Sequence, residues 1–237
     1  MRGFALVLVV AVSCKTETNY PVGGGGGGGG GGTLHPDAPG DGGGSGSAMA
    51  RACVLTDPRD LTSCAGSGAA GLTVMLGNQT ATTADDGSFT ITRPTGTNVV
   101  WDVTGSTVVE SVTPYAGQTR ISVMDATMFA DLRSANGVQP VAGHGDLLVR
   151  VVRGGVSVPG EVVTAVPAND PYDTVYDGLT PQSWTPSATG TYGTAYLADV
   201  VSGTTAVRIS AGGTLQTTLS GIPITDGGMT FVVAEVP

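Results

Sequence analysis

The densest group of side chains that could do chemistry lies in residues 167–187, between two stretches of strand-like sequence. Six of its residues carry carboxylates or aromatic rings: Asp170, Tyr172, Asp173, Tyr176, Asp177 and Trp184. Closely spaced carboxylates, together with backbone carbonyls, suit a calcium ion. Aromatic faces on a loop suit a sugar ring or a protein partner.

Three interpretations of this loop are open. In the first, Tyr172, Tyr176 and Trp184 form a partner-binding surface. In the second, Asp170, Asp173 and Asp177 hold calcium, although their order does not match an EF-hand. In the third, the loop packs its aromatics onto its own domain and directs its aspartates to water.

Histidine and lysine are too scarce for most catalytic sites. The chain has two histidines, His35 and His144, and its single lysine is Lys15. A Schiff-base lysine in the folded part and a multi-histidine zinc site are therefore excluded within one chain. A Ser-His-Asp triad would have to use His144, which has Asp146 nearby in sequence. We interpret His144 as a turn residue, predict that the protein is not an enzyme, and assign it no cofactor.

The overall charge excludes one class of partner. The formal net charge is -9, and charged residues make up 12% of the chain. Nucleic-acid binding depends on cations that displace counterions from phosphate. The composition therefore argues against a nucleic-acid partner and is typical of a soluble acidic surface.

The N-terminus has the pattern of an export signal. Arg2 precedes an apolar run from Phe4 to Val12 that is too short to span a bilayer. Residues 1–13 are therefore predicted to be a signal peptide. The residues Ala11-Val12-Ser13-Cys14 resemble a bacterial lipobox, except that alanine stands where leucine is usual.

The lipobox resemblance implies that Cys14 is lipidated and anchors the protein to a membrane. The alternative is an ordinary signal-peptidase cut that leaves Cys14 free for an intermolecular disulfide. Lys15 stands where an aspartate usually signals inner-membrane retention. We therefore expect the bacterial cell envelope, at the outer membrane, periplasmic or surface-exposed.

Residues 14–49 are predicted to be a linker, because Gly23–Gly32 is an unbroken glycine run. Glycine loses the most backbone entropy on ordering, so such a segment favours a flexible coil. Beyond it, alternating runs such as Leu72–Leu76, Ser88–Ile91 and Leu147–Val152 predict β-strands. Asp125–Ala135 alone has helical spacing.

The strand-like part repeats itself. Residues 70–76, 84–91 and 97–103 match residues 159–166, 189–196 and 204–210, in the same order. We predict a first β-sandwich over 50–122, a short helical connector over 123–143, and a second β-sandwich over 144–237.

The run GLTVMLGNQTATTADDGSFTI resembles the carboxypeptidase regulatory-like, or transthyretin-like, sandwich family, which includes the collagen-adhesin B-type repeats. The second half resembles it again through GDLLVRVVRGGVSVPGEVVTAV and ATGTYGTAYL. The resemblance implies an all-β fold of two tandem Ig-like, prealbumin-like sandwiches. It also implies a non-catalytic stalk, adhesive or accessory module, since its motif residues serve turns and the core.

Some adhesin repeats of this kind carry a Lys–Asn isopeptide bond, which the folded part of this chain cannot form. Cys53 and Cys64 remain after Cys14 is lipidated, and an exported chain meets an oxidising compartment. We therefore predict a Cys53–Cys64 disulfide that adds roughly 2–3 kcal/mol of stability. A reactive thiol pair is the alternative, although the spacing does not fit a redox motif.

Together these features predict a membrane-anchored, exported lipoprotein with a structural, adhesive or accessory binding role. Its expected partners are the membrane, through the lipid, and a protein or glycan of the cell envelope. The alternative is a glycan- or small-ligand-binding lipoprotein that uses the loop 167–187.

Overall fold

The structure is a computed structural model that describes residues 46–65, 69–94, 99–180 and 183–237. The predicted signal peptide, Cys14 and nearly all of the predicted linker lie outside the described residues. The linker range ends too late, because a strand already begins at Ser47. Ser47–Met49 pair with Thr90–Thr92 and so belong to the folded part.

The described residues before and within the connector form seven strands and one helix. They are β1 (Ser47–Val54), β2 (Thr73–Leu76), β3 (Gln79–Thr82), β4 (Ser88–Thr92), β5 (Val100–Gly105), β6 (Val108–Pro114), β7 (Arg120–Val123) and α1 (Ala126–Ala135).

The described residues after α1 form nine strands. They are β8 (His144–Arg153), β9 (Val156–Ser157), β10 (Glu161–Val166), β11 (Val175–Asp177), β12 (Trp184–Thr185), β13 (Thr194–Val201), β14 (Gly203–Ala211), β15 (Thr214–Ile224) and β16 (Met229–Glu235).

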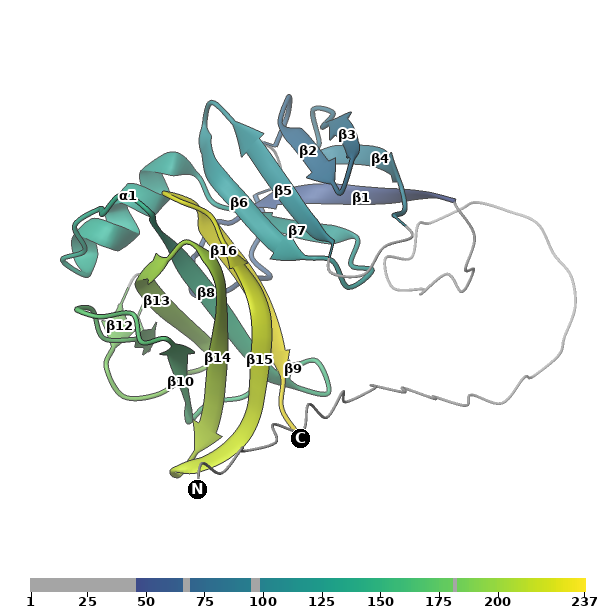
Figure 1. Cartoon of the computed structure of the whole chain (residues 1–237). Helices are drawn as coiled ribbons and strands as arrows, with labels where there is room; N and C mark the ends of the chain where they lie inside the picture. The colour runs from purple at the N-terminus through teal and green to yellow at the C-terminus, as the bar shows by residue number, and fades with distance from the viewer. Residues whose placement is uncertain (1–45, 66–68, 95–98, 181–182) are drawn as a thin grey trace, which may run out of the picture. The chain divides into compact units, whose positions relative to one another are not determined.

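The two halves pair their strands in the same way, which confirms the predicted all-β fold class (Figure 1). In the first half, β1 lies between β4 and β7, and β2–β5–β6 form the opposite layer. In the second half, β8 lies between β13 and β16, and β10–β14–β15 form the opposite layer. The matched sequence segments thus hold equivalent places: β2 corresponds to β10, β4 to β13, and β5 to β14.

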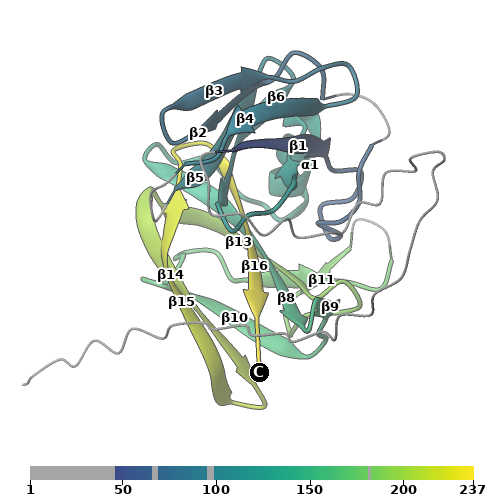
Figure 2. The same cartoon turned by 90° about the vertical axis from the view of Figure 1, so that its right-hand side faces the viewer.

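Each half buries its own apolar side chains between its two layers, as alternation along the strands predicts. In β2, Val74 and Leu76 are buried while their neighbours Thr73 and Met75 are exposed. The first core includes Trp101, packed edge-on against Phe89 with ring centroids 5.7 Å apart. The second core is aliphatic apart from the ring of Tyr176. Figure 2 shows the layers from the side.

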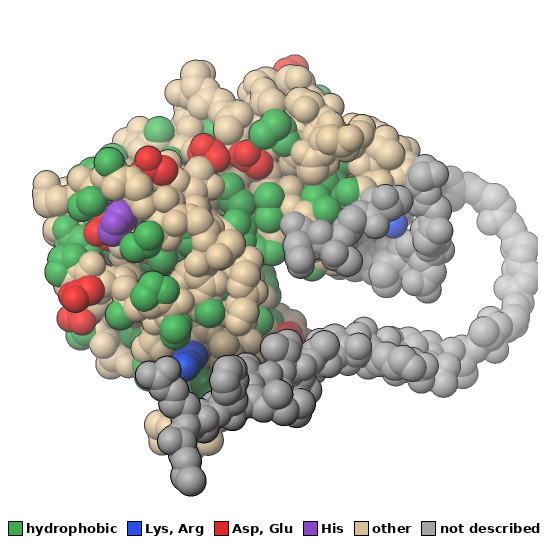
Figure 3. Space-filling view, in the orientation of Figure 1, with side chains coloured by type: hydrophobic (Ala, Val, Ile, Leu, Met, Phe, Trp, Pro, Cys, Tyr) green, Lys and Arg blue, Asp and Glu red, His purple; other side chains and the backbone are tan. Residues whose placement is uncertain are grey.

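The charged side chains on the surface are few and mostly acidic, as the composition predicts. On the face shown in Figure 3, acidic side chains are spread in small groups among mostly uncharged residues, and cationic side chains are few. This distribution agrees with a net charge of -9 carried by a chain that is only 12% charged.

The predicted helix is confirmed as α1, and Asp125 caps it. The Asp125 carboxylate accepts hydrogen bonds from the backbone N–H groups of Thr127 and Met128, which satisfies donors that the first turn leaves free. Phe129 and Leu132 face inward to a third apolar cluster. That cluster also contains Leu148 of β8 and Phe231 of β16, so the helix covers the outer face of the second half's central strands.

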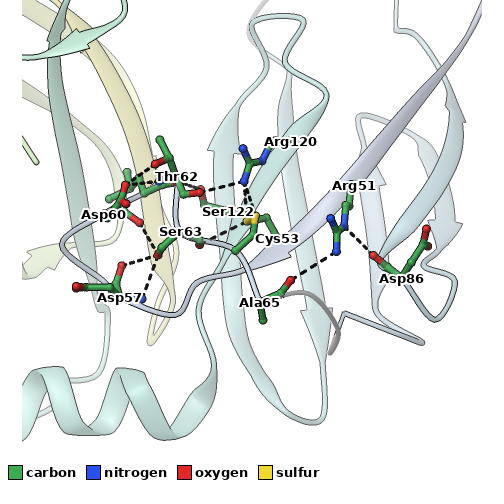
Figure 4. Close-up of a disulfide and its surroundings, with 12 residues drawn as sticks. Arg51, Cys53, Asp57, Asp60, Thr62, Ser63, Ala65, Asp86, Arg120 and Ser122 are labelled. Atoms are coloured by element: carbon green, nitrogen blue, oxygen red, sulfur yellow. Dashed lines mark hydrogen bonds between the residues drawn. A yellow bond between two sulfur atoms is a disulfide. The ribbon is translucent and has the colours of Figure 1, made fainter. Parts of the chain in front are cut away.

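The predicted disulfide between Cys53 and Cys64 is confirmed, with Cα atoms 5.2 Å apart (Figure 4). Within the loop that it closes, the Ser63 hydroxyl donates to the backbone oxygen of Asp60 at 2.7 Å. The Arg120 guanidinium donates to the backbone oxygen of Thr62 at 3.0 Å. The loop is therefore fixed both covalently and by hydrogen bonds to β7.

The C-terminal strand β16 joins the halves into one ten-stranded sheet, because it pairs in parallel with β8 and β6. The β8 pairing runs over the whole strand, from Met229 to Glu235. Successive residues of a parallel strand direct their backbone groups to opposite sides. The Asp146 N–H donates to Gly228 O and the Val236 N–H to Val152 O, so even-numbered residues of β16 face β8.

The parity of β16 predicts that proline destabilises neighbouring positions to different extents. Ala234→Pro removes an N–H that faces β8 inside the sheet, and should lower the free energy of unfolding by about 3 kcal/mol. Val233→Pro removes an N–H that faces away from β8, and should lower it by about 1 kcal/mol or less. Urea unfolding followed by circular dichroism measures both. Equal losses would show that the parity is wrong.

Candidate functional site

The insertion singled out in the sequence adds strands to the sheet instead of forming one free loop. Its residues 175–177 form β11, which pairs antiparallel with β13, and residues 184–185 form β12, which pairs with β11. β11 and β12 thus extend the sheet beyond β13. The candidate residues within these strands are therefore placed by strand register, which the sequence did not reveal.

The Asp177 side chain is buried and has a structural role. It is not placed on an exposed loop, as the calcium interpretation expects. Its Oδ1 accepts the N–H groups of Gly190 and Thr194 at 2.8 Å, and its Oδ2 accepts that of Tyr192 at 2.7 Å. Three charge-assisted hydrogen bonds compensate the desolvation of the carboxylate. A side chain at position 190 would clash, because a Cβ there would lie 2.3 Å from Asp177 O. Asp177 thus fixes the turn that leads into β13.

Asp170 and Asp173, the other two calcium candidates, are exposed on the segment before β11 and do not converge on Asp177. Among the described residues, no group of three or more His, Cys, Asp or Glu side chains is placed to hold a metal ion. The calcium interpretation therefore has no support in the geometry.

Tyr176 is also structural: its side chain is 3% exposed. The Tyr176 hydroxyl accepts the Val163 N–H and donates to the Val163 carbonyl, both at 3.1 Å. It therefore replaces a neighbouring strand at the free edge of β10. Burial raises the pKa of this phenol, which stays protonated and able to donate. As a buried residue it cannot offer its ring to a partner, which corrects its assignment to the binding surface.

Tyr172 and Trp184 are half-buried and lie on different hollows. The Tyr172 hydroxyl accepts the backbone N–H of Gln139 at 2.8 Å. Trp184 packs on Tyr196 with ring centroids 5.7 Å apart, and lines a hollow beside α1. The two rings therefore line different hollows, although both pack against the apolar cluster that contains Tyr196.

Tyr172 belongs to a hollow of about 480 Å³ between the 168–174 segment and the edge of β10. Its lining includes Asp170, Asp173 and Thr174 on one side and Thr164 and Ala165 of β10 on the other. The hollow combines an aromatic ring, two exposed carboxylates and hydroxyl groups, which are groups that bind sugar hydroxyls and ring faces.

His144 lies at the start of β8, and its contact is Asp199, not Asp146 as its sequence neighbourhood suggests. Its Nδ1 lies 2.9 Å from the Asp199 backbone oxygen and 3.3 Å from Asp199 Oδ2. Asp199 is 2% exposed and has a positive φ of 58° at an irregularity in β13. The pair fixes this irregular part of β13 against the start of β8.

Asp146 is the centre of a buried polar network. It accepts two hydrogen bonds from the Arg133 guanidinium, at 2.8 and 3.0 Å. It also accepts the Tyr196 hydroxyl at 2.7 Å and the Asp199 N–H at 3.0 Å. Burial would lower the pKa of Arg133, but the bonds to Asp146 outweigh it and raise that pKa. Burial raises the pKa of Tyr196, which keeps its proton for Asp146. The network ties α1 to β8 and β13.

Sequence reasoning missed Arg59, which links the disulfide loop to the insertion. Its guanidinium donates to the carbonyl oxygens of Gly178, at 3.1 Å, and Thr180. It also pairs with Asp57 at 2.6 Å. Burial alone would raise the pKa of Asp57, but the hydrogen bonds from Arg59 outweigh it and lower that pKa. A Pro-Arg-Asp turn gave no local signal of a contact so distant in sequence.

Comparison with known proteins gives few matches. No family model and no curated protein matches the chain. Among solved structures, the TIE protein of Bacillus anthracis is 14% identical with a TM-score of 0.25. The match covers 80% of this chain but 34% of that one, so the chain spans about a third of it.

Two pilins give similar values. The minor pilin GBS52 of Streptococcus agalactiae is 12% identical with a TM-score of 0.25, over 81% of this chain and 95% of that one. The shaft pilin SpaA of Lactobacillus rhamnosus GG is 10% identical with a TM-score of 0.24, over 81% and 97%. Such scores do not establish a common fold. In the part of the chain that the structure describes, no helix is long and apolar enough to cross a membrane.

The two tyrosines of the insertion should respond differently to loss of the hydroxyl. Tyr176→Phe leaves the buried Val163 N–H and carbonyl unpaired, and should lower the free energy of unfolding by about 2 kcal/mol. Tyr172→Phe, whose hydroxyl bonds at an exposed position, should lower it by about 0.5 kcal/mol. Thermal or urea unfolding measures the difference. A Tyr176→Phe protein as stable as the parent would contradict the structural role of that hydroxyl.

Proposed function

We propose that the chain is a non-catalytic, exported lipoprotein of the bacterial cell envelope, anchored through Cys14, with a structural, adhesive or accessory binding role. The observation that carries the proposal is the use of its reactive side chains inside the fold. Asp146, Asp177, Tyr176 and His144 all hold backbone or buried partners. Side chains with such fixed partners stabilise the fold, which supports a structural role for them.

Two further features support this proposal. The Cys53–Cys64 disulfide suits an oxidising compartment outside the cytoplasm. The sequence of residues 1–14 combines an export signal with a lipobox-like end. The glycine-rich sequence that follows would separate the sandwiches from a lipid surface.

Lipid anchoring is tested by removing the acceptor thiol. Cys14→Ser should move the exported protein from the membrane fraction to the soluble fraction and abolish labelling by an alkyne-tagged fatty acid. The reason is that the acyl chains supply the membrane affinity, at about 0.8 kcal/mol for each buried methylene. Thr16→Ser, two residues away, is the matched control and should leave both readouts unchanged.

Anchoring would be refuted by a Cys14→Ser protein that stays in the membrane fraction, or by an unacylated mature parent in mass spectrometry. The outer-membrane assignment has its own test, because Lys15→Asp should then shift the protein to the inner membrane on a density gradient. If Lys15→Asp leaves the distribution unchanged, Lys15 does not direct sorting.

A second candidate function is glycan or small-ligand binding at the hollow beside Tyr172. The observation that favours it is the combination of the half-buried Tyr172 ring with the Asp170 and Asp173 carboxylates around one hollow of about 480 Å³. Tyr172 here replaces Trp184 as the residue expected to stack on a sugar.

A glycan array tests this candidate directly. Tyr172→Ala should weaken any bound glycan by about tenfold or more, because a stacked aromatic ring is lost. Trp184→Ala is the control, since Trp184 lines a different hollow and should leave glycan binding within about twofold. An array without a hit, or equal loss in both variants, would count against glycan binding here.

A further inference from the structure

The pairing between β6 and β16 stops after two residue pairs, although both strands continue. The register pairs Met229 with Ser111 and Thr230 with Val112. The next bond of this ladder would run from the N–H of residue 114 to the carbonyl of Phe231. Residue 114 is proline, which has no N–H to give. The Pro114 carbonyl is also occupied, because the Gln118 amide donates to it at 2.7 Å.

A crevice opens where the two strands part. It has a volume of about 300 Å³, with Thr113 and Pro114 of β6 on one side and Phe231 to Val233 of β16 on the other. The disulfide loop and β7 contribute to the lining from across the crevice. Among the described residues, no strand pairs with β16 on this side beyond Thr230.

The open side of β16 exposes backbone hydrogen-bonding groups. Even-numbered residues of β16 face β8, so the Phe231 carbonyl and both backbone groups of Val233 face the crevice. The Val233 side chain is 61% exposed, large for a valine in an interior strand of a sheet. An unpaired strand edge of this kind can accept an added strand.

The positive charge around the crevice favours an added strand that carries acidic side chains. Two arginines, Arg120 and Arg150, line the crevice, and its lining includes no aspartate or glutamate. Arg150 donates to the Ser157 hydroxyl at 3.0 and 3.1 Å, and Arg120 to the Thr62 carbonyl, so their described partners are uncharged. Two cations in one crevice give it a local positive charge, although the whole chain has a net charge of -9. Figure 4 shows Arg120 beside the disulfide.

We propose that this crevice binds an extended acidic segment of another protein, which pairs its backbone with the open edge of β16 and directs carboxylates to Arg120 and Arg150. The bound segment would continue the sheet where Pro114 interrupts it. The side chains of Phe231 and Leu61 pack in one cluster with Leu148, so they lie on the same face of the sheet as Arg150 and would contact the methylene groups of the acidic residues. The residues that alternate with the acidic ones would lie on the opposite face, beside Val232. This site is separate from the hollow at Tyr172 and does not depend on lipid anchoring.

A model peptide tests the proposal on the full chain. The probe is the fluorescein-labelled, end-capped heptapeptide Thr-Val-Glu-Val-Glu-Val-Thr, and its matched control has lysine at both glutamate positions. Fluorescence anisotropy should show saturable binding of the acidic peptide and binding about tenfold or more weaker for the lysine peptide. Arg150→Gln should weaken the acidic peptide about tenfold or more. Arg208→Gln, an exposed arginine on β14, is the control and should stay within about twofold.

Backbone pairing has a separate readout. An added strand uses alternate N–H groups, so N-methylation of one alternate set of peptide amides should abolish binding while methylation of the other set leaves it. The Val233→Pro protein, which lacks the edge N–H, should also lose binding. In the isolated full chain the Val233 amide should exchange with solvent rapidly, and the acidic peptide should slow it.

Four results would overturn the proposal. One is no saturable binding up to about 1 mM peptide, which is weaker than a specific contact. The second is equal binding of the acidic and lysine peptides. In the third, both N-methylated peptides, or neither, lose binding. The fourth is slow exchange of the Val233 amide in the isolated chain, because the chain's own residues would then already occupy the edge.

Discussion

The fold depends on the parallel pairing made by β16, Met229–Glu235. β16 lies between β8 and β6, so the second half cannot complete its central layer, nor join the first half in one sheet, without the C-terminal strand. Parallel pairs need long connections, and the entropy of closing them must be offset by burial. Here that burial is large: Met229, Phe231 and Ala234 are each at most 2% exposed.

Buried carboxylates organise the regions that strands alone do not fix. Asp146 holds α1 and the irregular part of β13, and Asp177 holds the turn before β13. Burying a charge is unfavourable unless donors surround it, and each of these carboxylates has three or more. The insertion, the helix and the disulfide loop are thus placed on the second half by charge-assisted hydrogen bonds. The residue types that suggest chemistry in the sequence serve here as structural anchors.

Local pattern was enough to predict much of the fold. Alternation located β2, β4 and β8, helical spacing located α1, and cysteine content with export signals gave the Cys53–Cys64 bond. The repeat between the halves was visible because equivalent strands have equivalent burial. All of these signals arise from neighbours in sequence, or from a period of two or of 3.6 residues.

The site was predicted less well, because its geometry depends on non-local register. Tyr176 and Asp177 look like loop residues, yet pairing of Tyr176 with Ala195 places both inside the protein. His144 has Asp146 two residues away, but Asp146 accepts from Arg133 and Tyr196, and the irregularity in β13 brings Asp199 to His144 instead. Arg59 contacts Gly178, and the pairing of β6 with β16 ends at Pro114. Both features depend on which strands become neighbours, and no local sequence pattern contains that information.

The position of β16 after the other described strands of its sheet has a consequence for synthesis. A ribosome delivers the N-terminal half first, and that half can form its own paired layers while the rest is still being made. The second half, in contrast, lacks one neighbour of β8 until Met229–Glu235 emerge. Until then the apolar side chains of β8 that β16 covers stay exposed, so the second half completes its fold after the first.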